Sequence, residues 1–189
     1  MTGTLQFRPR YAGVAVLLIV ASLAVQGGEA AHGSTVSTVS TSDSTIRLRA
    51  LFRDEIQTLA LRTAIPVLLP PTLPWSGEVP KLYLTGQATT PRWRISVAAA
   101  PGCRNATACF VASFEGVRAT ALPKAPNLRL PGGQPAVYTP IRCGASCGPA
   151  TLTFLHRGVV VTWRLKEPPR GGSPALARLA AAAIAVGSR

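Results

Sequence analysis

The sequence is poor in the side chains on which enzymes and metal sites usually depend. Its 189 residues include two histidines and seven acidic residues. The acidic residues are scattered, and the one adjacent pair, Asp54 and Glu55, would point in different directions on a helix rather than act together. The chain has no P-loop, no dinucleotide-binding fingerprint and no histidine-rich metal motif. We therefore expect a protein without enzymatic activity, cofactor or metal ion.

One short motif makes a hydrolase a possible function, which ranks third after the two binding functions described below. The run from Gly144 to Gly148 matches the G-x-S-x-G pattern of α/β hydrolases, with Ser146 as the candidate nucleophile. That pattern works on a turn from a strand to a helix, which lifts the serine into an exposed position. Here Pro149 and a β-rich run follow instead, and no partner for His156 is evident nearby. We therefore expect Ser146 to have no catalytic role and His156 to be a strand-end residue.

Negative charge is scarce compared with positive charge. Twenty basic residues against seven acidic ones give a formal net charge of +13. Such an excess favours association with polyanions such as anionic lipid head groups, cell-wall phosphate polymers or nucleic acid, but it does not define a site. Most of the basic residues are arginine, a bias that GC-rich coding DNA also produces. A solvated surface with dispersed charge therefore remains the alternative to a binding surface.

The apolar run near the N-terminus is short for a membrane span. It extends from Tyr11 to Val25, after Arg8 and Arg10 and before the small residues at 27–31. A basic start, ~7–15 apolar residues and a small-residue exit are typical of a signal peptide, whereas a span needs about 20 residues. We expect residues 1–30 to direct export to the periplasm, the cell surface or the medium. An N-terminal transmembrane anchor is the alternative.

The four cysteines, Cys103, Cys109, Cys143 and Cys147, follow this leader. An even count in an exported chain indicates disulfides, and the short spacings favour Cys103–Cys109 and Cys143–Cys147 among three possible connectivities. A four-thiolate zinc site is the alternative, but the spacing of the first pair is longer than zinc sites usually have. The two-residue spacing of redox motifs is absent. A disulfide that closes a loop this short stabilises the folded state by less than the ~3 kcal/mol estimated for a 15-residue loop.

Hydrophobic periodicity predicts one domain of class α+β over residues 46–189. Residues 31–45 are rich in serine and threonine and read as a disordered linker. Apolar residues then recur every three or four positions over 46–62, which predicts an amphipathic helix. Prolines over 66–74 predict an extended segment, and alternation from residue 79 onward predicts strands. Ser173, Pro174 and Gly187 delimit an alanine-rich C-terminal helix. We expect an antiparallel sheet of five to seven strands with this helix on one face.

The alternation also predicts which side chains share a face. A two-residue turn at Arg157-Gly158 would place Leu152 opposite Trp163, with both pointing inward. If the tryptophans point inward, their neighbours along the strands point outward. The outward basic residues are then Arg92, Arg94, Arg164 and Lys166, with Arg142, Arg118 and Arg129 as further candidates.

This basic sheet face supports the leading functional hypothesis, an exported binding or structural protein of the cell envelope. Each guanidinium presents a planar fork of donors that suits phosphate or carboxylate, so an anionic envelope polymer or lipid surface is the expected partner. Nucleic acid is a poorer fit because the tryptophans that would stack on bases point the other way. The alternative is a carrier that holds an apolar ligand between the sheet and the helix. The sequence does not predict an oligomeric state.

Several segments together resemble exported bacterial proteins of uncharacterised function. These segments are Ile65 to Pro70, Cys143 to Cys147, the Gly158 hairpin and the alanine-rich last helix, and they span residues 65–187. The resemblance implies a compact sheet with a C-terminal helix. It implies no activity and no catalytic residues.

Overall fold

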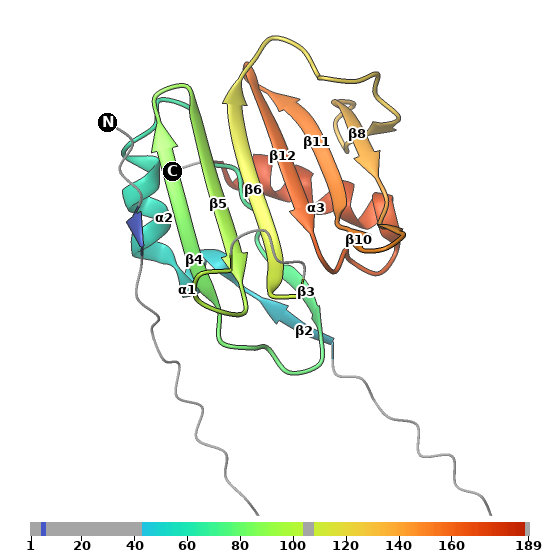
Figure 1. The fold of residues 1–189 in the computed structure, drawn as a ribbon. Helices are drawn as coiled ribbons and strands as arrows, with labels where there is room; N and C mark the ends of the chain where they lie inside the picture. The colour runs from blue at the N-terminus through green and yellow to red at the C-terminus, as the bar shows by residue number, and fades with distance from the viewer. Residues whose placement is uncertain (1–4, 7–42, 104–107, 188–189) are drawn as a thin grey trace, which may run out of the picture.

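Seven strands between Tyr83 and Leu165 form one antiparallel sheet, and a C-terminal helix packs on it (Figure 1). The structure is a computed structural model that describes residues 5–6, 43–103 and 108–187. Across the sheet the strands are β4 (Tyr83–Thr89), β5 (Arg92–Ala98), β6 (Phe110–Arg118), β12 (Val159–Leu165), β11 (Ala150–His156), β8 (Pro135–Thr139) and β7 (Leu128–Arg129). The two-residue strand β1 (Leu5–Gln6) adds to the free edge of β4. The predicted α+β class is confirmed.

Two small ribbons lie outside this sheet. Strand β2 (Asp43–Ile46) pairs with β3 (Leu73–Ser76), and β9 (Arg142–Cys143) pairs with β10 (Cys147–Gly148). β2 therefore includes the last three residues of the segment that the sequence assigns to a linker, while residues 31–42 lie outside the described residues. Of the expected signal peptide, residues 1–30, the structure describes β1, and the other residues lie outside the described ranges.

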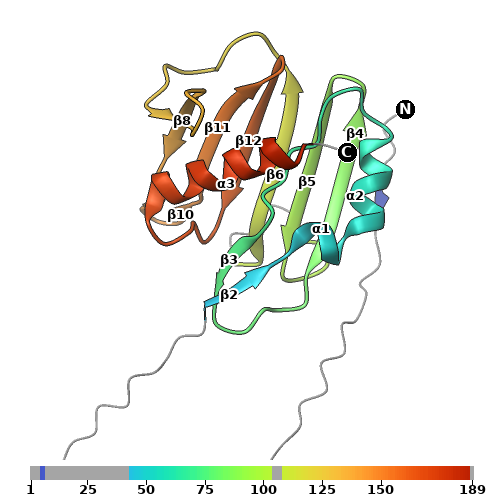
Figure 2. The same ribbon diagram turned by 180° about the vertical axis from the view of Figure 1, so that it is seen from behind.

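Within the described residues, three helices cover one face of the sheet (Figure 2). In the region 46–62, the chain forms α1 (Leu48–Leu51) and α2 (Arg53–Ala60) rather than one helix, because Phe52 between them has non-helical φ and ψ angles of −127° and 39°. Helix α3 (Gly172–Val186) ends before Gly187 as the sequence predicts, but it begins before Ser173. Seen from behind the sheet, α2 lies over β4 and α3 crosses β12, β11 and β8.

The hairpin of β11 and β12 has the register that the sequence predicts. Arg157 and Gly158 both have positive φ, 49° and 72°, as a two-residue type I′ turn requires. Leu152 faces Trp163, Phe154 faces Val161 and His156 faces Val159. This turn therefore fixes which residues of both strands face the core.

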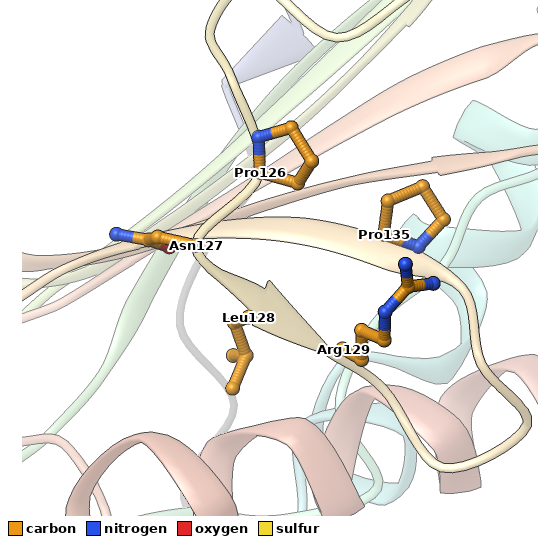
Figure 3. Close-up of a pocket in the computed structure, with 5 residues that line it drawn as sticks. All are labelled: Pro126, Asn127, Leu128, Arg129 and Pro135. Carbon is orange, nitrogen blue, oxygen red and sulfur yellow. The ribbon is translucent and has the colours of Figure 1, made fainter.

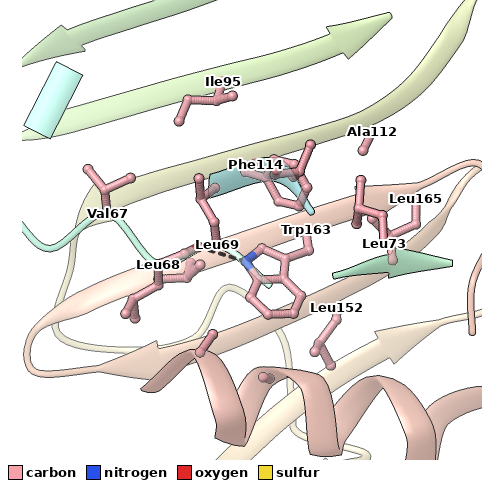
Figure 4. Close-up of a cluster of buried hydrophobic side chains, with 14 of the residues drawn as sticks. Val67, Leu68, Leu69, Leu73, Ile95, Ala112, Phe114, Leu152, Trp163 and Leu165 are labelled. Carbon is pink, nitrogen blue, oxygen red and sulfur yellow. Dashed lines mark hydrogen bonds between the residues drawn. The ribbon is translucent and has the colours of Figure 1, made fainter. Parts of the chain in front are cut away.

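The core lies between the sheet and its helical cover (Figure 4). The Trp163 ring meets Phe114 and Phe154 edge-on, with ring centroids 6.1 and 5.5 Å apart. Two indole N–H groups also cross the core. Trp93 donates to the Pro66 carbonyl at 2.8 Å, and Trp163 donates to the Leu68 carbonyl at 3.1 Å. These bonds hold the proline-rich segment, residues 65–74, against the sheet, where it runs between α2 and α3 (Figure 2).

Candidate polyanion-binding surface

The side of the sheet that faces away from the helices carries polar side chains from six neighbouring strands, and we call it the outer face. Each of its residues alternates with a core residue on the same strand. In β5, for example, Trp93, Ile95 and Val97 are buried while Arg92 and Arg94 are exposed. The antiparallel sheet thus has one packed face and one face that is open around these arginines, whereas Thr153 and Val137 on the same outer side are buried.

The strand register brings four of the sequence-predicted residues onto this outer face. Arg92, Arg94 and Arg164 are exposed there, and Lys166 is half-exposed at the end of β12. Arg92 and Arg94 are two residues apart on one strand, so their Cα atoms are about 7 Å apart. Arg164 lies two strands away from them, on β12.

The four cations differ in how they are engaged. Arg94 pairs with Glu115 at 3.0 Å, and Lys166 donates to the Ala108 carbonyl at 2.9 Å. Arg92 and Arg164 have no side-chain hydrogen bond or ion pair within the described residues. Glu115 is also the one acidic residue among the strands of the described sheet. The face is therefore strongly positive, and two of its guanidinium groups are available to a ligand.

A row of hydroxyl groups runs through Arg164 across the sheet, and sequence reasoning missed it. The residues directly opposite one another on β4, β5, β6, β12, β11 and β8 are Thr85, Ser96, Ser113, Arg164, Thr151 and Thr139. We call this set the Arg164 row. With strands about 4.8 Å apart, it extends for about 24 Å. The alternation within each strand is visible in the sequence, but the row depends on the register between strands.

Of the three other arginines considered from the sequence, Arg129 reaches the outer side of the sheet, at its edge, and the other two lie elsewhere. Arg142 belongs to the β9–β10 ribbon, because the chain leaves the sheet at Pro140 after β8. Arg118 ends β6, and Arg129 lies on the edge strand β7, where it donates to the Gly133 carbonyl at 3.0 Å. The structure therefore does not bring Arg142 together with the other four.

The cysteines form the two local disulfides that their spacing favours, Cys103–Cys109 and Cys143–Cys147. The second joins residues directly opposite each other in the β9–β10 ribbon. Disulfides indicate an oxidising compartment, as expected for an exported protein. Within the described ranges, no cluster of histidine, cysteine and acidic side chains is arranged to hold a metal ion.

The structure keeps Ser146 and His156 apart. Ser146 is exposed in the disulfide-closed ribbon that precedes β11, whereas His156 is the last residue of β11. The length of β11, from Ala150 to His156, is about 20 Å. The Gln134 amide nitrogen lies 3.3 Å from Nδ1 of His156. Burial, and secondarily the neighbouring charge of Arg157, lowers the pKa of His156. His156 is thus a neutral strand-end residue at pH 7, without a serine or carboxylate partner in the described structure.

A hollow of about 330 Å³ at the sheet edge offers no better site (Figure 3). It lies beside β7 and is lined by Asn127, Leu128, Arg129 and two prolines. The Asn127 amide is occupied, because it both donates to and accepts from the Tyr138 backbone, at 2.9 and 2.7 Å. Arg129 is bonded within its own turn. The polar groups of this hollow therefore close the β7–β8 hairpin.

Comparison of the chain with protein-family models, curated proteins and solved structures finds no match. Among the helices of the described residues, none has the length and apolar character to cross a membrane. Any functional assignment therefore depends on the geometry of this chain alone.

Proposed function

We propose that this protein is an exported, non-enzymatic component of the cell envelope whose outer face binds an anionic polymer or surface. The observation that carries the proposal is the placement of Arg92, Arg94, Arg164 and Lys166 on one face whose described strands hold a single carboxylate, Glu115. Arginine forks bind phosphate and carboxylate oxygens through two parallel hydrogen bonds.

The Arg164 row supports a polymer that bears both anionic and hydroxyl groups. Arg164 has Ser113 on one side and Thr151 on the other, so an anion on its guanidinium would lie near two hydroxyls, of which that of Thr151 also donates to the Pro149 carbonyl at 3.4 Å. Hydroxyls can both donate and accept, which suits a polyol or sugar chain linked by phosphates. Such a chain would lie across the strands, along the ~24 Å of the row.

Co-sedimentation with purified cell wall, anionic vesicles and neutral vesicles, at low and high salt, tests the proposal. The variant is Arg92→Gln/Arg94→Gln/Arg164→Gln, made in the full protein with its disulfides intact. We expect binding to wall or to anionic vesicles that weakens with salt, because exposed charges are screened beyond about 10 Å at 0.1 M. We expect the triple variant to lose at least tenfold in affinity.

The matched control removes the same charge from the helical cover. Arg53, Arg62 and Arg178 are exposed on or beside α2 and α3, so Arg53→Gln/Arg62→Gln/Arg178→Gln also lowers the net charge by three. Equal loss of binding in both triple variants would mean that net charge alone drives association. Absence of binding at low salt would reject the proposal, and the two vesicle arms separate a lipid surface from a wall polymer.

A further inference from the structure

A second hollow, of about 360 Å³, opens between the helical cover and the tip of the β11–β12 hairpin. We call it the Arg49 pocket. Its walls include Arg49 of α1, Ile56 of α2, Ile65 and Val67 of the proline-rich segment, and Arg157 of the hairpin turn. Its volume falls within the ~300–1,000 Å³ of small-molecule sites. The pocket combines apolar walls with two arginines, and none of its lining residues is acidic.

Arg49 is a half-buried cation whose hydrogen-bond partners, among residues 43–103 and 108–187, are neutral backbone carbonyls. Its Nη2 donates to the carbonyls of Val67 and Gly187, at 3.4 and 3.2 Å, which ties α1 to the end of α3. Burial lowers the pKa of this guanidinium, but an arginine remains charged at neutral pH. A guanidinium carries five N–H donors, so these two bonds leave others for a ligand. A charge taken partly out of water without a counter-ion favours an anion beside it.

Arg157 supplies the second charge from a position where arginine is unusual. It adopts φ of 49° in the hairpin turn, a left-handed conformation in which glycine, asparagine and aspartate dominate. Its guanidinium has no hydrogen bond or ion pair within the described part of the chain. Turn geometry alone would be better served by asparagine, so the turn does not explain this arginine.

We infer that the Arg49 pocket binds a small amphipathic anion. Its carboxylate or phosphate head would lie between the guanidinium groups of Arg49 and Arg157, and its apolar body would pack on Ile56, Ile65 and Val67. This site is separate from the outer face, because it lies in the helical cover and at the hairpin tip. It gives the carrier hypothesis a different location from the space under α3, which core side chains occupy.

Isothermal titration calorimetry tests the inference with decanoate and decyl phosphate as probes. Decanol, which has the same tail without a charge, and inorganic phosphate, which has no tail, are the reference ligands. We expect at least one of the two anions to bind at least tenfold more tightly than both references. The stronger of the two anions identifies the head group.

Two variants assign the binding to the pocket. Arg157→Asn removes the charge while keeping a residue that tolerates positive φ, so its melting temperature should be maintained or raised while the Kd rises at least tenfold. Arg49→Met keeps the length of the side chain and should have the same effect on Kd. Arg62→Gln, next to the pocket region but not among its lining residues, should leave Kd unchanged. If Arg49→Met does not fold, Arg157→Asn decides.

Three results would overturn the inference: no binding of either anion, equal affinity for decanol and the anions, or an unchanged Kd in Arg157→Asn. The outer-face triple variant should bind both probes normally. Failure of the polyanion proposal and failure of this one are therefore distinguishable.

Discussion

The two faces of the sheet differ in burial and in polarity, although the same strands form both. On the inner face Trp93, Phe114 and Trp163 are completely buried, and on the outer face their neighbours along the same strands, Arg94 and Arg164, are exposed. Adjacent residues of a strand point to opposite faces, so each strand contributes to both environments. Packing determines the residues of the inner face, which leaves the outer face free to carry charge and hydroxyl groups.

The two faces also satisfy their polar atoms differently. The inner face gives its indole N–H groups to backbone carbonyls of a distant segment, and within the described residues no buried side-chain nitrogen or oxygen lacks a partner. On the outer face, hydroxyls such as those of Thr153 and Thr162 bond to each other at 3.2 Å. A substitution on the inner face therefore disturbs several elements, while one on the outer face disturbs its near neighbours.

The largest difference in stability should come from substituting two adjacent residues of β12, Trp163 and Arg164. Trp163→Ala removes the ring that contacts Phe114 and Phe154 and leaves the Leu68 carbonyl without its donor. Large-to-small changes of this kind cost about 3–5 kcal/mol, whereas Arg164→Ala on the exposed face should cost less than about 0.5 kcal/mol. Urea unfolding of both variants measures the difference. Similar losses in the two would mean that the faces are not energetically distinct.

A smaller contrast separates two positions on β6. A Cβ on Gly116 would overlap the indole of Trp93, which lies directly over that glycine. Gly116→Ala must shift a fully buried ring, so we expect a loss of about 1–3 kcal/mol. Ser113→Ala, on the outer face of the same strand, should change the free energy of unfolding by less than about 0.5 kcal/mol. Thermal unfolding compares the two, and a neutral Gly116→Ala would contradict the close contact.

Much of this contrast could be predicted from the sequence, because it depends on local spacing. Alternation around Trp93 gave the correct inward and outward residues of β5, and Arg157-Gly158 gave the register of the β11–β12 hairpin. The cysteine spacings likewise gave both disulfides. In each of these cases the partners are close in the chain, so few alternatives compete.

Three features that sequence reasoning missed join distant segments. The indole of Trp163 bonds to a carbonyl 95 residues away, and the Arg164 row needs the register of six strands at once. The Arg49 pocket combines α1, α2, the proline-rich segment and a hairpin turn. Nothing in the local pattern around Arg49 or Arg157 indicates that they line one hollow. The break at Phe52 is local, and it was missed for a different reason: the apolar periodicity continues through it.

The smallest expected effect concerns His156, which lies at the end of an inward-facing row but is only partly buried. Burial, with a smaller contribution from Arg157, lowers the pKa of His156 in the folded state below its ordinary value of about 6.5. As the pH falls through 6.5, the unfolded chain binds a proton at this position before the folded chain does. The free energy of unfolding should therefore decrease as the pH is lowered below about 6.5, and this decrease should level off below the pKa of the folded state.

Urea unfolding between pH 7.5 and 4.5, beside an NMR titration of the imidazole, measures this effect. His156→Gln should abolish its share of the pH dependence. Arg157→Asn should raise the pKa of His156 only part of the way, because burial is the larger cause. A full return to the ordinary pKa in that variant would assign the shift to charge and would place His156 in solvent. The outermost buried pair of this hairpin would then be the next inward-facing one, Phe154 and Val161.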